Sequence, residues 1–387
     1  IKIDDPRLKP ALSSYSKQNY IYAEPELFRY LQLHPNDIVV RVTYAHTLVE
    51  LGKVGQARSE LVQMENNPDS KNNIFYSWMI PKIKYQLTGK EKSINNENAW
   101  DEYNAYLEFM HLPNVSKDIE REVESAIHSP DPLAPLQKEV CTKYISTNLE
   151  LINTILQSKE KPECYLSLSS NIGKAPTLAK TLVVYGRLQA DNDNIAEAVH
   201  AYRKTIRFGQ QMSQGSFLVH FIAFTIRSSG EDGFAGLLKS NHVTRYKDAQ
   251  LILDTLKELQ NMDPLSTMEN IHQFEQPDNK EESDNSYPEA LVRAHEVETK
   301  LILLETSAAV KSCKLKEGKT PTDLAFLLPS YLTNLPIDTF GNNRIVMKSI
   351  GQDFVLYSLG PDLTDDDGQI PYDPTNGTLS KGDLIYP

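Results

Sequence analysis

The stretch PEALVRAHEVETKLILLETSAAVKSCKLK, from Pro288 to Lys316, decides the fold of the last part of the chain. Apolar residues recur along it at helical intervals, which predicts one long amphipathic helix. These residues are Leu291, Val297, Leu301, Leu304, Ala308 and Val310. Two runs with strand character follow at 343–348 and 352–358, and a last run at 383–386 predicts an edge strand. The plan is one long helix followed by a small antiparallel sheet.

Upstream of this stretch the sequence predicts helices. Residues 37–51 and 54–66 show helical periodicity, and Gly52 between them is suited to end the first helix and turn the chain. Two short helices joined in this way form an antiparallel hairpin. Further helices are expected at 97–110, 136–158, from Phe217 onward and at 246–261.

The first hairpin resembles a tetratricopeptide unit. The small residues that the family places in its two helices fall on Ala45 and Ala57, its turn glycine falls on Gly52, and its closing proline falls near Pro68. The same spacing recurs once, in Leu182, Tyr185, Gly186, Ala198 and Tyr202. Because the two units are not contiguous, the resemblance implies isolated hairpins inside an irregular α-solenoid. Such hairpins either bind a peptide or only pack against neighbouring helices, and both alternatives stay open.

A change in composition marks the predicted domain boundary. Residues 276–286 contain many charges and no large apolar side chain, so this segment is expected to be a mobile linker. The predicted fold is therefore α+β in three parts. A helical domain covers 1–275, an acidic polar linker covers 276–287, and an α+β module covers 288–387.

The C-terminal module resembles the major pseudopilin of type II secretion and the type IV pilins. The runs that match the family's pattern are Cys313–Gly318 with Pro321-Thr322, Leu328–Asp338, Tyr357–Asp362 and Gly382–Ile385. Cys313 stands where the family usually has Tyr, and a helical domain replaces the family's membrane-inserting half-helix. The resemblance therefore implies the fold but not ordinary pilus assembly. Families of planctomycete-like bacteria join a helical region to such a module in a similar way.

Acidic residues are concentrated in the final loop. They are Asp362, Asp365, Asp366, Asp367, Asp373 and Asp383. Carboxylates and backbone carbonyls at a tight turn are the ligands that Ca²⁺ prefers. The resemblance to pseudopilins assigns the metal-ligand roles to Asp362, Asp383 and the carbonyl of Leu359, with Asp365 and Asp366 as replacements in this longer loop. The alternative is a solvated acidic turn.

An EF-hand fits this loop less well than a pseudopilin-type site. In the EF-hand register, Leu363 and Pro374 would occupy positions that require oxygen ligands.

Composition and cysteine content limit the possible partners and metal sites. The chain has 387 residues and a net charge of −12, which gives it no general attraction for phosphate backbones, so nucleic acid is not an expected partner. Its three cysteines, Cys141, Cys164 and Cys313, are too dispersed for a structural zinc site. They are interpreted as buried thiols, and a Cys141–Cys164 disulfide stays open.

No motif of a known catalytic site occurs in the sequence, which lacks H-E-x-x-H, G-x-S-x-G, a P-loop and G-x-G-x-x-G. We interpret His220, within an apolar run, as a core histidine. Glu231-Asp232 reads as a helix start, and His295-Glu296 has no second histidine at zinc spacing. No catalytic or organic-cofactor residue is predicted.

These observations favour a non-enzymatic, extracytoplasmic scaffold or protein-binding protein with a calcium-stabilised C-terminal module. It would bind a protein partner and serve in secretion or cell-envelope assembly. The chain opens on Ile1, which is consistent with a signal peptide or membrane anchor upstream. The alternative is a hydrolase-like enzyme whose site is assembled between the helical and C-terminal domains. A cleft with clustered carboxylates or histidines would favour that alternative.

Overall fold

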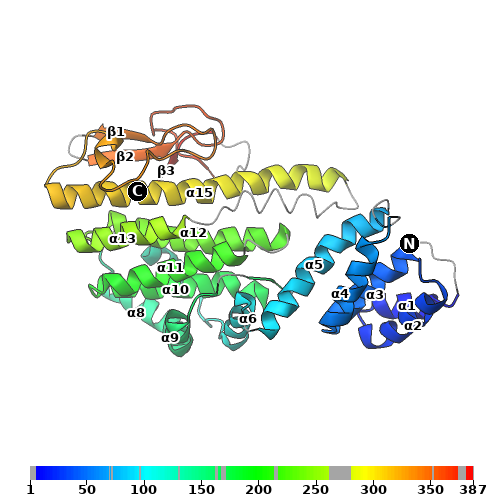
Figure 1. Cartoon of the computed structure of the whole chain (residues 1–387). Helices are drawn as coiled ribbons and strands as arrows, with labels where there is room; N and C mark the ends of the chain where they lie inside the picture. Colours follow the sequence, from blue (N-terminus) through cyan, green and yellow to red (C-terminus); the bar gives the residue numbers. More distant parts are fainter. Residues whose placement is uncertain are drawn as a thin grey trace. The chain divides into compact units, whose positions relative to one another are not determined.

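The computed structural model describes residues 6–68, 70, 73–95, 97–129, 131–161, 164–166, 171–212, 217–260, 280–350, 353–373 and 381–386. The chain is α+β, as predicted: it is mostly helical and carries one three-stranded antiparallel sheet near its C-terminus (Figure 1). It divides into two compact units. The first comprises residues 1–102, 160–168 and 272–276, and the second comprises 103–159, 169–271 and 277–387.

The first unit contains the helices that come first along the described part of the chain. They are α1 (Lys9–Ser16), α2 (Tyr20–Leu33), α3 (Ile38–Glu50), α4 (Val54–Glu65) and α5 (Ile74–Ile94). Asp37 caps α3, because its Oδ1 accepts a hydrogen bond from the Val40 amide at 3.1 Å. Gly52 turns the chain toward α4 with a φ of 69°, a conformation that favours glycine. The hairpin predicted at 37–66 is therefore present.

The second unit contains the other helices of the described residues. They are α6 (Ala99–Phe109), whose first turn belongs to the first unit, α7 (Lys117–His128), α8 (Pro135–Ile145), α9 (Leu149–Gln157), α10 (Ala175–Asp191), α11 (Ile195–Met212), α12 (Phe217–Lys239), α13 (Tyr246–Leu259) and α15 (Lys280–Glu317). Short 3₁₀ turns lie at η2 (Ser146–Asn148), η3 (Ile172–Lys174) and η4 (Leu324–Leu327).

The single helix predicted at 136–158 is wrong, because η2 separates α8 from α9. The buried Asn148 side chain accepts a hydrogen bond from the His111 amide at 3.0 Å and donates one to the His111 carbonyl at 2.8 Å. These two bonds to a distant segment accompany the break, and the local sequence does not reveal them.

The second hairpin, α10 and α11, is packed closely around a tyrosine. Tyr202 of α11 is 1% exposed, and a Cβ added to Gly186 of α10 would lie 2.4 Å from its ring. A Cβ added to Gly233 of α12 would lie 2.6 Å from the same ring. Glycine is therefore required at both positions by the approach of the helices to Tyr202.

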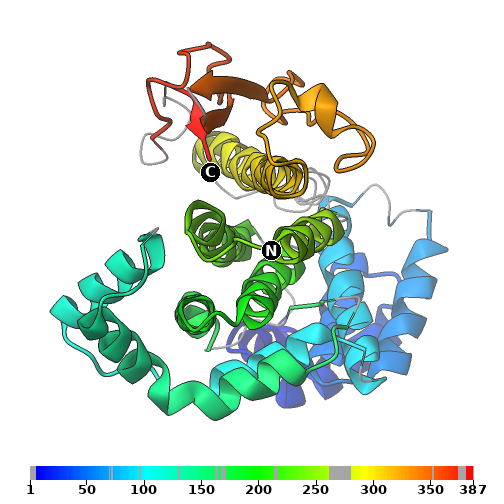
Figure 2. The same ribbon diagram turned by 90° about the vertical axis from the view of Figure 1, so that its left-hand side faces the viewer.

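The second unit is layered. Figures 1 and 2 show the sheet on one side of α15, with α12 and α13 on its other side and α10 and α11 beyond them. Its strands are β1 (Val346–Ile350), β2 (Asp353–Ser358) and β3 (Leu384–Ile385), in the order β1-β2-β3. β3 pairs antiparallel with β2 through Ser358 and Leu384, which confirms the predicted edge strand.

A buried carboxylate joins this sheet to α15. Asp338, which is fully buried, accepts a hydrogen bond from Ser358 Oγ on Oδ2 at 2.6 Å. Its Oδ1 accepts from the Phe340 amide at 2.8 Å and from Thr299 Oγ1 of α15 at 3.4 Å. One side chain thus ties the end of β2, the loop before β1 and the long helix together.

The units do not divide the chain where composition changes. α15 starts at Lys280, inside the segment predicted as a linker at 276–287, whose first residues lie outside the described part. Glu and Lys are good helix formers, so a charged segment can still be helical. Ala290, Ala294 and Val297 of α15 share a core with Phe224 of α12. The C-terminal module therefore lies in one unit with helices that the sequence assigned to the domain 1–275.

Candidate functional site

The predicted calcium ligands lie in the loop that follows β2. Leu359 comes directly after the strand and is half-buried, whereas Asp362 is exposed. The Oδ1 of Asp362 accepts a hydrogen bond from the Thr364 amide at 3.1 Å, which forms a local turn. Asp362 therefore uses one carboxylate oxygen to stabilise its own loop.

Asp383, at the other end of this loop, is fully buried. Its Oδ2 accepts a hydrogen bond from the Gly368 amide at 2.7 Å, and its Oδ1 has no hydrogen-bond partner within the described residues. Burial raises the pKa of Asp383, and the charges of Asp365 and Asp366 raise it further. The loop thus places Asp365 and Asp366 where their charges act on the poorly solvated carboxylate of Asp383.

Tyr357 of β2 holds the acidic loop against the sheet. Its hydroxyl donates a hydrogen bond to Asp365 Oδ1 at 3.0 Å, and the same oxygen accepts one from the Asp367 amide at 2.8 Å. Asp367 is paired with Lys348 Nζ at 2.8 Å. Two of the loop's acids therefore have partners.

Close backbone contacts shape the two ends of the loop. Gly360 and Gly382 both have positive φ, at 67° and 103°. A Cβ on Gly360 would lie 2.6 Å from the Gly382 carbonyl oxygen, and one on Gly382 would lie 2.5 Å from the Ile370 carbonyl oxygen. Larger residues would disturb the approach that buries Asp383.

The side chains alone do not form a metal site. Among the residues that the structure describes, no three His, Cys, Asp or Glu side chains form a group that could hold a metal ion. A calcium ion here would need Asp383, one of its acidic neighbours and backbone carbonyls together, which is a donor set that Ca²⁺ accepts. The unpartnered Oδ1 of Asp383 fits such an ion.

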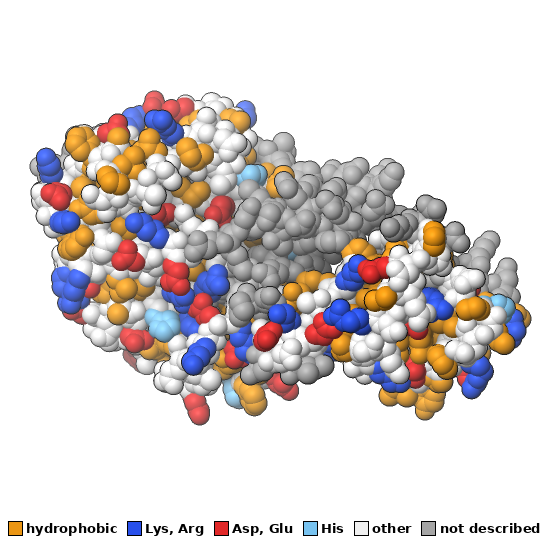
Figure 3. All heavy atoms as spheres, viewed as in Figure 1, with side chains coloured by type: hydrophobic (Ala, Val, Ile, Leu, Met, Phe, Trp, Pro, Cys, Tyr) orange, Lys and Arg blue, Asp and Glu red, His pale blue; other side chains and the backbone are white. Residues whose placement is uncertain are grey.

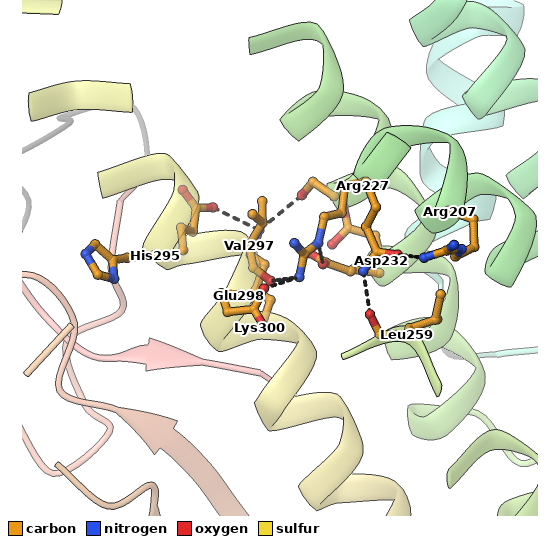
Figure 4. A network of polar contacts seen from close by, with 12 residues as sticks. Arg207, Arg227, Asp232, Leu259, His295, Val297, Glu298 and Lys300 are labelled. Atoms are coloured by element: carbon orange, nitrogen blue, oxygen red, sulfur yellow. Dashed lines mark hydrogen bonds and ion pairs between the residues drawn. The ribbon is translucent and has the colours of Figure 1, made fainter. Parts of the chain in front are cut away.

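A second polar site lies between α12 and α15 and was missed by sequence analysis (Figure 4). Arg227 is 1% exposed, and its Nε donates to Glu231 Oε1 at 2.8 Å. Its Nη2 donates to Glu298 Oε2 at 2.8 Å and to the Val297 carbonyl at 3.2 Å. This buried cation is therefore shared by one carboxylate of its own helix and one of the long helix.

Glu231 is the more deeply buried of the two acids that face Arg227. It is fully buried, and its Oε2 has no hydrogen-bond partner in the described part of the chain. Burial raises the pKa of Glu231 to about 7, although Arg227 and Lys300 lower it. Arg227 stays charged, because Glu298 also faces it.

A neighbouring cluster is centred on Glu296 of α15. Its Oε1 pairs with Lys300 Nζ at 2.9 Å, and its Oε2 pairs with Arg293 Nη1 at 2.7 Å. Tyr372 donates to the same Oε2 at 3.4 Å. Asp232 of α12 accepts a hydrogen bond from the Tyr386 hydroxyl at 2.5 Å. Tyr372 and Tyr386, near the C-terminus, therefore donate hydrogen bonds to acidic side chains of α15 and α12.

A groove of about 410 Å³ opens beside this cluster. Its lining residues come from α12 and α15. They are Phe221, Phe224, Thr225, Ser228, Ser229, Asp232, Arg293, Glu296 and Val297. Its size lies in the range of small-molecule sites. Glu231 is not among the described residues that line the groove.

One interpretation of the acidic residues needs correction. Glu231-Asp232 does not start a helix but lies in the middle of α12. His295-Glu296 lies within α15, in the long helix predicted from Pro288. The i, i+4 pairs Arg227–Glu231 and Glu296–Lys300 were the available signal. Their burial was not visible in the sequence. His220 is fully buried, as interpreted.

The cysteines are free thiols. Cys141, Cys164 and Cys313 are all buried and unbridged. Burial raises the pKa of Cys141 to about 11 and that of Cys164 to about 12, so both are poor nucleophiles near neutral pH.

Within the described residues, no helix combines the length and apolar character needed to cross a bilayer.

Comparison of the chain with protein-family models, curated proteins and solved structures finds no match in any of the three.

Proposed function

We propose that this chain is a non-enzymatic scaffold or protein-binding protein whose pseudopilin-like C-terminal module is stabilised by calcium. The observation that carries the calcium part is the Oδ1 of Asp383, which is buried without a hydrogen-bond partner among the described residues. A bound cation would supply that missing partner and relieve the repulsion from Asp365 and Asp366.

The proposal predicts that calcium raises thermal stability. An ion that binds only the folded state adds about 2.7 kcal/mol when its concentration is 100 times its Kd. We expect the melting temperature to be higher by several degrees in millimolar Ca²⁺ than in EGTA, measured by calorimetry on the whole chain. The shift should disappear in Asp383→Asn, which removes the charge but keeps the size.

An exposed acid gives the matched control. Asp118 in α7 has a side chain that is 85% exposed, so Asp118→Asn should keep the full calcium shift. An equal shift in Asp383→Asn and the unchanged chain would refute the loop as the site. Asp362→Ala tests the assignment carried over from the pseudopilin family. If Asp362 is a ligand, its loss weakens the calcium response.

The scaffold part of the proposal is supported by the helical hairpins and by an apolar surface on α2. Large apolar side chains are exposed on this helix: Ile21, Tyr22, Phe28 and Leu33. Their exposed fractions of 72%, 68%, 47% and 65% are high for residues of this size. Figure 3 shows hydrophobic side chains at the surface of the first unit. Large apolar patches on a surface are typical of protein-binding sites, and these four side chains lie on one helix.

A second candidate function is a hydrolase-like enzyme. It is favoured by the groove, whose lining includes two carboxylates, Asp232 and Glu296, from helices on either side of the predicted domain boundary. It ranks second because Glu296 is engaged by Arg293, Lys300 and Tyr372, which leaves it poorly placed to exchange a proton.

An activity screen separates the two candidates. Turnover of an ester, peptide or glycoside substrate that is abolished by Asp232→Asn or Glu296→Gln would overturn the scaffold proposal. Absence of turnover in the unchanged chain, together with a calcium shift that depends on Asp383, supports the scaffold.

A further inference from the structure

One carboxylate in the groove of α12 and α15 has no cationic partner among the residues that the structure describes. Asp232 is half-buried and lines the groove. Its Oδ1 accepts the Tyr386 hydrogen bond at 2.5 Å, and within the described residues it forms no ion pair. The pKa of Tyr386 is raised well above its ordinary value by burial and by Asp232, so the tyrosine remains a neutral donor. Its hydrogen bond orients the Asp232 carboxyl group.

The nearby cations are committed elsewhere. Arg293 is ion-paired with Glu296 at 2.7 Å. Lys300 donates to Glu296 Oε1 at 2.9 Å and to Ser228 Oγ at 3.2 Å, and its ammonium lies 5.5 Å from the centre of the Tyr386 ring. Burial lowers the pKa of Lys300, but Glu296 and then Asp232 raise it more. Lys300 thus feels the charge of Asp232 without forming an ion pair with it.

The rest of the groove suits the hydrocarbon part of a ligand and extra hydrogen-bond donors. Phe221 and Phe224 form an aromatic part of its lining, which favours both alkyl groups and cations. The Ser229 and Thr225 hydroxyls donate to the carbonyls of Thr225 and Phe221 in their own helix. Because their hydrogens are already donated, their oxygens can only accept hydrogen bonds from a ligand.

We propose that this groove binds a primary ammonium group carried on a short hydrocarbon chain, with Asp232 as its counter-ion. The ammonium would donate to Asp232 and to the hydroxyl oxygens, and the alkyl chain would pack on the phenylalanines. A volume of about 410 Å³ accommodates a chain of this kind. The ligand source is either a free alkylamine or the lysine side chain of a peptide. The residues that line the groove are distinct from the predicted calcium ligands.

The direct test is titration of the whole chain with n-pentylammonium, followed by isothermal calorimetry or by NMR shifts. The matched probes are n-pentanol, which keeps the chain but lacks the charge, and pentanoate, which reverses it. We expect pentylammonium to bind at least about tenfold more tightly than pentanol, which corresponds to about 1.4 kcal/mol. We expect no binding of pentanoate. Equal affinity for pentanol, or tighter binding of pentanoate, would overturn the proposal.

Two variants tie the affinity to the proposed counter-ion. Asp232→Asn removes the charge but keeps an oxygen that can accept from Tyr386, so the fold is retained and affinity for pentylammonium falls about tenfold. Glu289→Gln makes the same charge change at an exposed residue about one turn of α15 from Arg293. It should leave the affinity within about twofold, because screened long-range charge contributes little.

The melting temperature of each variant is measured to confirm folding. If Asp232→Asn proves unfolded, Phe221→Ser tests the aromatic wall, and it should also weaken binding. Equal losses in Asp232→Asn and Glu289→Gln would overturn the site, since the effect would then be general electrostatics.

Two further arms distinguish the sources of the ammonium. A capped Gly-Lys-Gly peptide is compared with its norleucine analogue, which has the same chain without the charge. Binding of the lysine peptide, lost in Asp232→Asn, identifies a partner's lysine side chain as the ligand. Binding of pentylammonium without the peptide identifies a free alkylamine. Failure of both probes overturns the proposal but leaves the calcium response of Asp383 intact, so the two ideas fail separately.

Discussion

Asp338 is a single residue that organises the C-terminal part of the chain. Its two oxygens accept from Ser358, Phe340 and Thr299, which belong to three different segments. A buried carboxylate is tolerated only where such donors surround it. The sequence offers no periodicity that marks this position, because its partners lie from two to thirty-nine residues away.

Asp338→Ala should therefore be costly. Removing the carboxylate leaves the buried Ser358 hydroxyl and the Phe340 amide without their acceptor, so we expect the free energy of unfolding to fall by about 3 kcal/mol. Urea unfolding followed by circular dichroism measures the change. Asp338→Asn, which keeps one acceptor oxygen, should lose less. A loss no greater than that of the exposed Asp118→Ala would show that Asp338 is not a structural hub.

Glu231 is the residue whose ionisation state should change stability near neutral pH. Its folded pKa of about 7 lies above the ordinary value of 4.5, because burial favours the neutral acid. Below about pH 4.5 the group is neutral in both the folded and unfolded states. Its contribution to stability is then fully present, and it is lost as the pH rises through 7.

Glu231→Gln should remove this pH dependence. Gln keeps an oxygen that can accept from Arg227 but cannot ionise. Relative to this variant, we expect the unchanged chain to lose on the order of 1–3 kcal/mol between pH 5 and pH 8. Urea unfolding at several pH values gives the comparison, and Glu289→Gln serves as the exposed control. Parallel stability curves for the unchanged chain and Glu231→Gln would contradict the shifted pKa.

At the scale of elements, glycines reveal which helices approach closely. Gly186 of α10 faces the ring of Tyr202, where an added Cβ would lie 2.4 Å away. Gly55 of α4 has no atom within 4 Å of the corresponding position. Both glycines lie in helices, so a comparison of the same substitution at the two positions separates the effect of packing from that of helix propensity.

Gly186→Ala and Gly55→Ala should change stability in opposite directions. Alanine at Gly55 favours the helix and should add about 0.5–1 kcal/mol. At Gly186 the same methyl group displaces a fully buried ring, so we expect a loss of about 1–3 kcal/mol. Thermal unfolding of both variants measures the difference. Stabilisation by Gly186→Ala would mean that Tyr202 moves without cost.

At the scale of the whole chain, the C-terminal sheet shares a unit with α12, α13 and α15. The sequence instead suggested an independent module at 288–387. α15 is part of the predicted module at 288–387, since it contacts β2, but it also packs on α12 and α13. Loss of the sheet should therefore weaken helices that the sequence placed in another domain.

Leu356→Ala in β2 tests this coupling. Leu356 is 1% exposed, and removing its side chain should cost about 2–5 kcal/mol. If the unit is cooperative, hydrogen exchange in α12 and α13 should accelerate along with exchange in the sheet. Faster exchange confined to residues 288–387 would support the separate module, and the helices of the first unit provide the internal reference.

The sequence by itself determined the local elements. Asp37, Gly52 and the apolar periodicity bounded the hairpin of α3 and α4, and alternating residues located β2. These features depend on neighbours within a few residues, so they can be read directly. The crowded acids of the last loop were visible for the same reason, although their role in binding calcium stays a prediction.

Only the tertiary structure decided which of these acids are buried and what they face. Asp383 is enclosed by a glycine-lined loop, Glu231 is buried between α12 and α15, and Asp232 is left facing a groove without an ion pair among the described residues. In the sequence all three are ordinary carboxylates. Their desolvation and their partners come from segments that are distant along the chain, and these long-range contacts set their chemistry.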